Sequence, residues 1–131
     1  MTPGPVGGPV RVLVADDDPD IRQLVELAVS RAGLELVASV GTGTAALAAI
    51  REHRPSLAVL DVAMPGLTGL EVCAAVRADP AVSGMRLLLL SASVHGEAME
   101  AGGAAGADDY LSKPFRVKEL AERIGGAVGV R

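Results

Sequence analysis

Blocks of apolar residues alternate with polar segments along the chain, and their spacing predicts five strands separated by helices. Short runs rich in Val, Leu and Ala have the length and composition of buried strands. These runs lie at residues 10–15, 34–40, 57–61, 85–91 and 109–112. Apolar residues at helical spacing fill the intervals between the runs and the segment after the last one. The predicted helices lie at residues 19–32, 46–52, 70–78, 97–105 and 117–128.

This order of elements predicts the fold class. Two parallel strands need a crossover connection between them, and that connection is right-handed in nearly all proteins. Five strands that alternate with helices therefore predict an α/β fold with a doubly wound, five-stranded parallel sheet covered on both faces. In the fourth helix, Gly102, Gly103 and Gly106 each cost roughly 1 kcal/mol of helical preference relative to Ala. We expect that helix to be short.

Length and composition narrow the possible organisation. The chain has 131 residues, which suits one globular domain. Pro and Gly crowd its first residues, so we expect a flexible leader at 1–9, a domain at 10–128 and a short tail at 129–131. The apolar run at 87–90 is far below the roughly 18 residues of a membrane-spanning helix.

Charge and cysteine content bear on partners and location. The net charge is −4 and no cluster of Lys and Arg stands out, which argues against direct nucleic-acid binding. The single cysteine, Cys73, falls on the apolar side of a predicted helix and is expected to be a small buried residue. A cytoplasmic protein without a signal peptide or membrane segment fits these features.

Polar residues with chemical potential follow four of the predicted strands directly. Asp16 and Asp17 follow the first strand, Asp61 ends the third, Ser91 ends the fourth and Lys113 comes just after the fifth. The carboxyl ends of parallel strands share one edge of the sheet, and ligands bind at that edge. The sequence therefore predicts one site built from three carboxylates, a hydroxyl and an ammonium group.

The carboxylates predict a metal ion and a nucleophile. Two carboxylates about 4 Å apart repel by roughly 4 kcal/mol at an effective dielectric near 20, so three in one pocket need a cation or protonation. Oxygen ligands favour Mg²⁺, with Asp17 and Asp61 as direct ligands and Asp16 acting through water. Asp61 is then placed to attack a phosphoryl group, whose charge Lys113 offsets and whose oxygen the Ser91 hydroxyl contacts.

The ordered set of motifs resembles the receiver domain of two-component response regulators, from about residue 10 to residue 124. The resemblance rests on the acidic pair after the first strand, Asp61 within LAVLDVAMPGLTG, Ser91 followed by Ala, and Tyr110 three residues before Lys113-Pro114. Each motif alone is weak, but their order is specific. It implies a flavodoxin-like (βα)5 fold with strand order 2-1-3-4-5.

The resemblance also implies a role for each site residue. Asp61 would be the phospho-acceptor, and Asp16, Asp17, Asp61 and the backbone carbonyl of Ala63 would hold Mg²⁺, or Mn²⁺ in its place. The family's pattern further implies that Lys113 contacts the phosphoryl group and precedes a cis proline.

A switch is implied by the same resemblance. Ser91 would contact the phosphoryl group, and the rotamer of Tyr110 would follow the position of Ser91. This movement would alter the face formed by the fourth helix, the fifth strand and the fifth helix, where an output domain or partner protein binds. The phosphoryl donor would be a sensor histidine kinase or a phosphotransfer protein, and a homodimer on phosphorylation is compatible with the pattern. The chain would be a self-phosphorylating and self-dephosphorylating switch, not a turnover enzyme.

Other interpretations of the same residues are open at this point. A pseudo-receiver would bind partners without phosphorylation, and a phosphatase of the haloacid-dehalogenase class would also use an aspartate nucleophile with Mg²⁺. That class carries a second aspartate two residues after the nucleophile, where this chain has Ala63. We interpret Asp18 as a helix cap and assign no role to His53 or His95. The sequence fits a single-domain regulator and a receiver cut from a longer transcription factor equally well.

Overall fold

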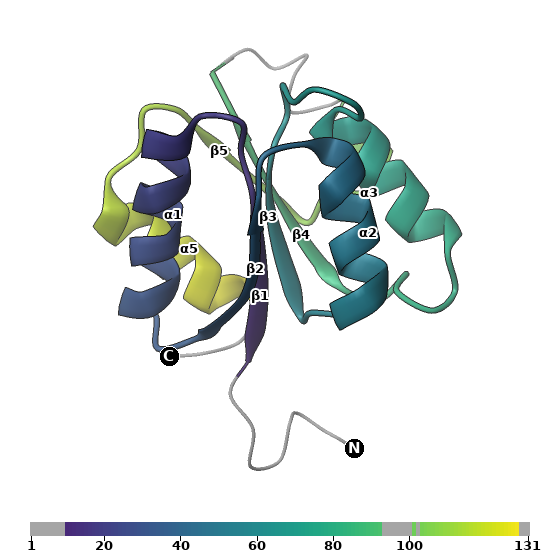
Figure 1. Cartoon of the computed structure of the whole chain (residues 1–131). Helices are drawn as coiled ribbons and strands as arrows, with labels where there is room; N and C mark the ends of the chain where they lie inside the picture. Colours follow the sequence, from purple (N-terminus) through teal and green to yellow (C-terminus); the bar gives the residue numbers. More distant parts are fainter. Residues whose placement is uncertain (1–9, 93–100, 102, 129–131) are drawn as a thin grey trace.

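The computed structural model describes residues 10–92, 101 and 103–128 and contains a five-stranded sheet. Its strand order is β2-β1-β3-β4-β5, and every neighbouring pair is parallel (Figure 1). The strands are β1 (Arg11–Ala15), β2 (Glu35–Val40), β3 (Leu57–Asp61), β4 (Arg86–Ser91) and β5 (Asp109–Ser112). The predicted fold class and strand order are both confirmed.

Helices cover both faces of this sheet. They are α1 (Pro19–Arg31), α2 (Gly43–His53), α3 (Gly69–Ala78) and α5 (Val117–Ala127). α1 and α5 lie on one face, and α2 and α3 lie on the other (Figure 1). Of the fourth predicted helix, residues 101 and 103–105 are helical, and the remainder lies outside the described residues. The expected leader at 1–9 and tail at 129–131 also lie outside them.

Capping residues explain where the helices begin and end. The Asp18 carboxylate accepts hydrogen bonds from the backbone of Asp20 and Ile21, which confirms its interpretation as the cap of α1. α2 includes His53, although its end was predicted before this residue. The helix ends instead at His53, and its capping residue Arg54 takes a left-handed φ of 47° and donates its N–H to the Ile50 carbonyl.

The core forms two aliphatic layers separated by the sheet. β3 and β4 lie in the middle of the strand order, and their side chains alternate between the layers. Leu57 and Val59 pack toward α1 and α5, whereas Ala58 and Leu60 pack toward α2 and α3. Cys73 is fully buried, as predicted, and burial raises the pKa of its thiol to about 12.

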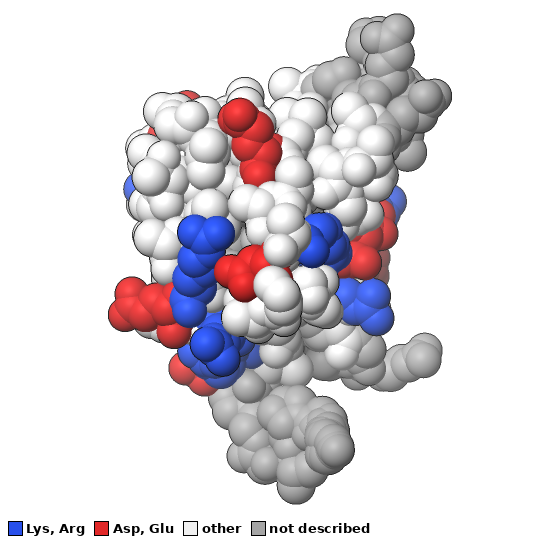
Figure 2. Space-filling view, turned by 90° about the vertical axis from the view of Figure 1, so that its right-hand side faces the viewer, with Lys and Arg blue, Asp and Glu red and all other residues white. Residues whose placement is uncertain are grey.

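The outer surface of α2 and α3 is largely uncharged. Four alanines are exposed along these helices: Ala45, Ala48, Ala74 and Ala78. Acidic and basic side chains lie beside one another on this side of the molecule (Figure 2). Among the described residues, no helix is long and apolar enough to cross a membrane.

Candidate functional site

The polar residues predicted from the strand ends meet at one edge of the sheet. A cavity of about 400 Å³ opens there. Its lining comprises Asp17, Asp18, Asp61, Val62, Ala63, Ser91, Ala92 and Lys113. A larger groove of about 590 Å³ lies between α1 and α5, but its lining contains none of the three clustered carboxylates. We therefore place the chemistry in the smaller cavity.

Three carboxylates form the acidic part of this site. Asp16, Asp17 and Asp61 each offer an oxygen within 4.8 Å of the others. Asp16 is fully buried and Asp61 nearly so, whereas Asp17 is exposed to solvent. The site therefore has one open acidic side, toward which a ligand can approach from water.

Lys113 is the basic counterpart of these acids. Its ammonium lies 2.9 Å from Asp16 Oδ2 and 3.2 Å from Asp61 Oδ1. Asp16 Oδ2 is buried without a hydrogen bond of regular geometry, so this close ammonium is its stabilising partner in the described part of the chain. Three carboxylates nevertheless lie close to one another beside this ammonium.

The surplus of negative charge alters proton affinities. Burial raises the pKa of Asp61, and repulsion from Asp16 raises it further, against the opposing effects of Lys113 and of a hydrogen bond from the Ala63 backbone. Burial would lower the pKa of Lys113, but its close ion pair with Asp16 and the charges of both carboxylates raise it overall. Lys113 is therefore held as a cation, while the charge on Asp61 is disfavoured in the absence of a further cation.

These observations fit a small divalent ion. The oxygens of three carboxylates lie close enough to share one ion, and an oxygen of Asp16 is buried without a regular hydrogen bond. Such a set of hard oxygen donors suits Mg²⁺, which also retains several waters. Asp16 Oδ1 accepts the N–H of Asp18 at 2.9 Å, whereas Asp16 Oδ2 lies 2.9 Å from the Lys113 ammonium.

The backbone around the acids is closely packed. A Cβ at Gly69 would lie 2.4 Å from the Asp61 carbonyl oxygen, so the start of α3 needs glycine at this position. Gly69 also donates its N–H to the Val62 carbonyl, and Gly43 donates to the Pro65 carbonyl. These contacts hold the loop that carries Ala63, and Ala63 lines the cavity.

Ser91 and Tyr110 occupy the strands next to the acids. Ser91 is buried at the end of β4 and lines the cavity. Tyr110 lies on β5, is half-buried, and packs against the core layer on the side of α2 and α3. The Lys113-Pro114 bond is cis, as the motif implied.

Arg22 is a neighbour of the site that sequence reasoning missed. Its guanidinium donates to the Asp16 carbonyl at 2.8 Å and fixes the turn that leaves β1. Its partner is a backbone oxygen, which any sequence position supplies, so no motif points to Arg22. Gly69 ends the motif LAVLDVAMPGLTG, but the motif did not reveal its packing against the Asp61 carbonyl.

Comparison with known proteins decides the family. The model of the response regulator receiver domain matches residues 12–125. The chain belongs to this family. The DNA-binding response regulator MtrA of Mycolicibacterium smegmatis is 40% identical over 114 residues, covering 87% of this chain and 48% of MtrA.

Two further similarities agree with the match. The transcriptional regulatory protein GltR of Pseudomonas aeruginosa is 41% identical over 113 residues, covering 86% of this chain and 46% of GltR. The chemotaxis response regulator CheY4 of Vibrio cholerae has a TM-score of 0.84 and 32% identity, covering 92% of this chain and 99% of the other. The chain spans about half the length of the curated relatives it matches.

The receiver domain is thus a phosphoryl-accepting signalling switch. The two other interpretations of the sequence are not favoured. A phosphatase of the haloacid-dehalogenase class needs a second aspartate where this receiver has Ala63. A pseudo-receiver needs no acidic site, yet three carboxylates and Lys113 converge here.

Proposed function

We propose that Asp61 is the residue that accepts the phosphoryl group. The single observation that carries this proposal is its position: a nearly buried carboxylate at the end of β3, 3.2 Å from the Lys113 ammonium. A carboxylate oxygen of Asp61 forms a bond to phosphorus as the bond between phosphorus and the donor group breaks. The products are an acyl phosphate on Asp61 and the released donor group, which carries away the bonding electron pair.

The neighbouring residues would support this transfer. Asp16, Asp17, Asp61 and the carbonyl of Ala63 would hold Mg²⁺, or Mn²⁺ in its place. When bound, the ion offsets the negative charge of the transferred group and of the carboxylates. Lys113 remains positively charged beside Asp61 and attracts the phosphoryl oxygens, and the Ser91 hydroxyl donates a hydrogen bond to one of them.

The same site would operate as a switch for a partner protein. Movement of Ser91 toward the phosphoryl group would change the packing space of Tyr110 on β5, and so the face formed by the fourth helix, β5 and α5. The donor would be a sensor histidine kinase or a phosphotransfer protein. An output domain, a partner protein or a second phosphorylated copy of the chain would bind to this face.

In this function the chain is a switch that carries one phosphoryl group. It is not an enzyme that turns over an outside substrate. Self-phosphorylation from a small donor and self-dephosphorylation by water would both occur at Asp61. A cytoplasmic location accompanies the proposed kinase donor, because such a kinase takes its phosphoryl group from ATP.

The decisive experiment is intact-mass measurement after incubation with acetyl phosphate and Mg²⁺, under an acid quench that preserves acyl phosphates. We expect one phosphoryl adduct on the native protein and none on Asp61→Asn. Asp20→Asn is the matched control, because Asp20 is an exposed carboxylate on α1, and it should be labelled normally. An adduct on Asp61→Asn, or no adduct and no response to beryllofluoride on the native protein, contradicts the proposal.

A further inference from the structure

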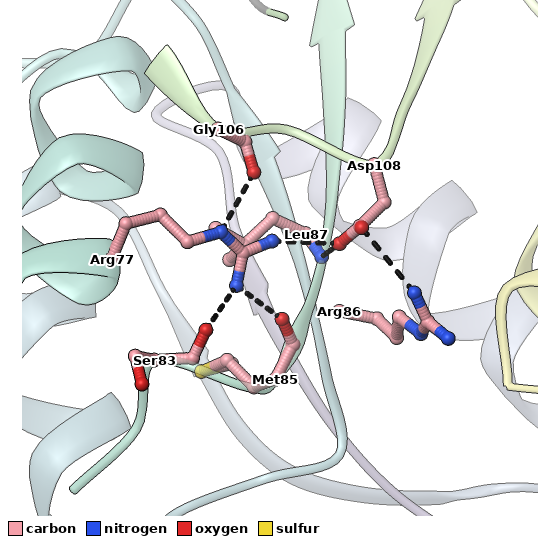
Figure 3. Close-up of polar contacts among 7 residues, drawn as sticks. All are labelled: Arg77, Ser83, Met85, Arg86, Leu87, Gly106 and Asp108. Atoms are coloured by element: carbon pink, nitrogen blue, oxygen red, sulfur yellow. Dashed lines mark hydrogen bonds and ion pairs between the residues drawn. The ribbon is translucent and has the colours of Figure 1, made fainter. Parts of the chain in front are cut away.

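Arg77 makes several polar contacts near the amino-terminal ends of β4 and β5, at the opposite end of the strands from the acidic site. Its Nε donates to the Gly106 carbonyl at 2.8 Å, and its Nη1 donates to the carbonyls of Ser83 and Met85 at 2.8 and 2.6 Å. Its Nη2 lies 2.8 Å from Asp108 Oδ2. Figure 3 shows the guanidinium between these groups. One side chain at the end of α3 thus binds the connection to β4 and the turn that leads into β5.

Asp108 passes this restraint to the start of β5. Its Oδ2 accepts the N–H of Leu87 at 2.8 Å (Figure 3). The N–H of Asp108 donates to the Leu87 carbonyl at 2.8 Å. Arg86 lies 3.4 Å from the other carboxylate oxygen. The next pair along the chain, Leu88 with Asp109, begins the β4–β5 ladder. Asp108 therefore fixes the register with which β5 joins the sheet.

The register of β5 determines where the catalytic ammonium lies. β5 is an edge strand of four residues with β4 as its neighbour in the sheet. A shift of one residue would turn each of its side chains to the opposite face. Lys113 follows β5 directly, and its N–H donates to the Ser91 carbonyl at 2.7 Å. Its contacts with both Asp16 and Asp61 therefore require this one register.

The turn before β5 is shaped around the arginine. Gly106 has a φ of +102°, which side chains of other residues rarely tolerate, and a Cβ at this position would lie 2.6 Å from Arg77 Cγ. Because Gly106 has no side chain, the backbone can pass directly over the aliphatic part of the Arg77 side chain. The guanidinium and the Gly106 carbonyl are consequently held together by close packing as well as by their hydrogen bond.

We propose that Arg77 is a positioning residue for phosphoryl transfer, which acts by holding Gly106 and Asp108 so that β5 presents Lys113 to Asp61. Arg77 itself touches neither the acids nor the phosphoryl group. Its effect on the rate rests on the proposed function of Asp61 and Lys113, but its effect on the position of β5 does not. The two claims can therefore be tested separately.

The test compares Arg77→Met with two control variants. Arg77→Met keeps most of the apolar stem but removes every polar contact of the guanidinium. Arg51→Met removes an exposed arginine of α2, which forms an ion pair with Asp79. Val76→Ala truncates a fully buried residue of the same helix, so it lowers stability without removing a polar contact to β5. Arg77→Lys restores a charge beside Asp108 and serves as the conservative variant.

Two measurements are made on each variant at a temperature where circular dichroism shows it to be folded. The first is amide hydrogen exchange at Leu87, Leu111 and Lys113, and the second is the rate of labelling by acetyl phosphate with saturating Mg²⁺. We expect Arg77→Met to lose protection at these amides and to be labelled roughly 10- to 100-fold more slowly, as for a misplaced catalytic group. Arg77→Lys should recover part of both losses, and both control variants should keep the native rate within about twofold.

Labelling of Arg77→Met at the native rate, or an equal slowing in Val76→Ala, overturns the proposal. If Arg77→Met does not fold, Arg77→Lys is measured against Val76→Ala by the same criteria. If the native protein takes no phosphoryl group, the proposed function fails, and hydrogen exchange alone decides the role of Arg77. Loss of protection confined to Leu87, Leu111 and Lys113 then supports positioning, and uniform loss across the sheet refutes it.

Discussion

Asp61→Asn should make the domain more stable when divalent cations are absent. The oxygens of Asp61 and Asp16 lie within 4.8 Å, where two like charges repel by roughly 3.5 kcal/mol at an effective dielectric near 20. Attraction to Lys113 at 3.2 Å is roughly 5 kcal/mol on the same scale. Burial of the Asp61 carboxylate opposes this attraction by several kcal/mol. The raised pKa of Asp61 shows that burial and repulsion together exceed the attraction.

The expected gain is therefore about 1 kcal/mol, which is roughly 3–6 °C in Tm for a domain of this size. Asn keeps the shape of the side chain and a carbonyl oxygen for the ammonium. Lys113 also retains Asp16 as its partner at 2.9 Å. The variant consequently loses one buried charge without leaving another charge unpaired.

Thermal unfolding followed by circular dichroism measures this effect, first in EDTA and then in Mg²⁺. A ligand at ten times its Kd stabilises the native protein by about 1.4 kcal/mol, and Asp61→Asn should gain less because it lacks one proposed ligand. Asp20→Asn should change stability by less than about 0.5 kcal/mol in both buffers. The reasoning is refuted if Asp61→Asn is the less stable protein in EDTA, or if Mg²⁺ stabilises both proteins equally.

Two further predictions concern α3, which begins beside the acids. Gly69→Ala should destabilise the domain by about 1–3 kcal/mol and reduce the Tm gain with Mg²⁺, because the new Cβ meets the Asp61 carbonyl oxygen at 2.4 Å; an unchanged Mg²⁺ response would contradict this. Thr68→Ala should cost about 1 kcal/mol, measured by urea unfolding, because Thr68 and Glu71 form a reciprocal capping box. Its phosphorylation should proceed as in the native protein, and a large loss of labelling would show that the cap also shapes the site.

The central strands could be predicted from the sequence because burial on both faces leaves a clear pattern. β3 has the predicted bounds, and β4 begins one residue later than expected at Arg86. Helix ends were harder to place. α2 begins at Gly43 because the Thr42 hydroxyl accepts the N–H of Ala45, a local hydrogen bond that apolar spacing does not reveal.

The acidic site was predictable for a similar reason. Parallel strands bring their carboxyl ends together, so Asp16, Asp61 and Lys113 had to meet once the strands were recognised. Their unequal burial was not predictable: both Asp16 and Asp17 follow the end of β1 at Ala15, but Asp16 is enclosed and Asp17 is exposed. The contacts of Arg77 were also hidden, since three of its four acceptors are backbone carbonyls.

α3 and β5 both run between the two ends of the strands, and each contacts the acidic site at one end. α3 begins with Gly69 packed on the Asp61 carbonyl and ends with Arg77, which binds Asp108 at the start of β5. β5 then runs back to Lys113, 3.2 Å from the Asp61 carboxylate. If Arg77 has the positioning role proposed above, a displacement of α3 beside the acids would also shift β5 and, with it, the ammonium. The distance between Lys113 and Asp61 thus depends on packing at both ends of the domain, so a substitution far from the acids can change the reaction.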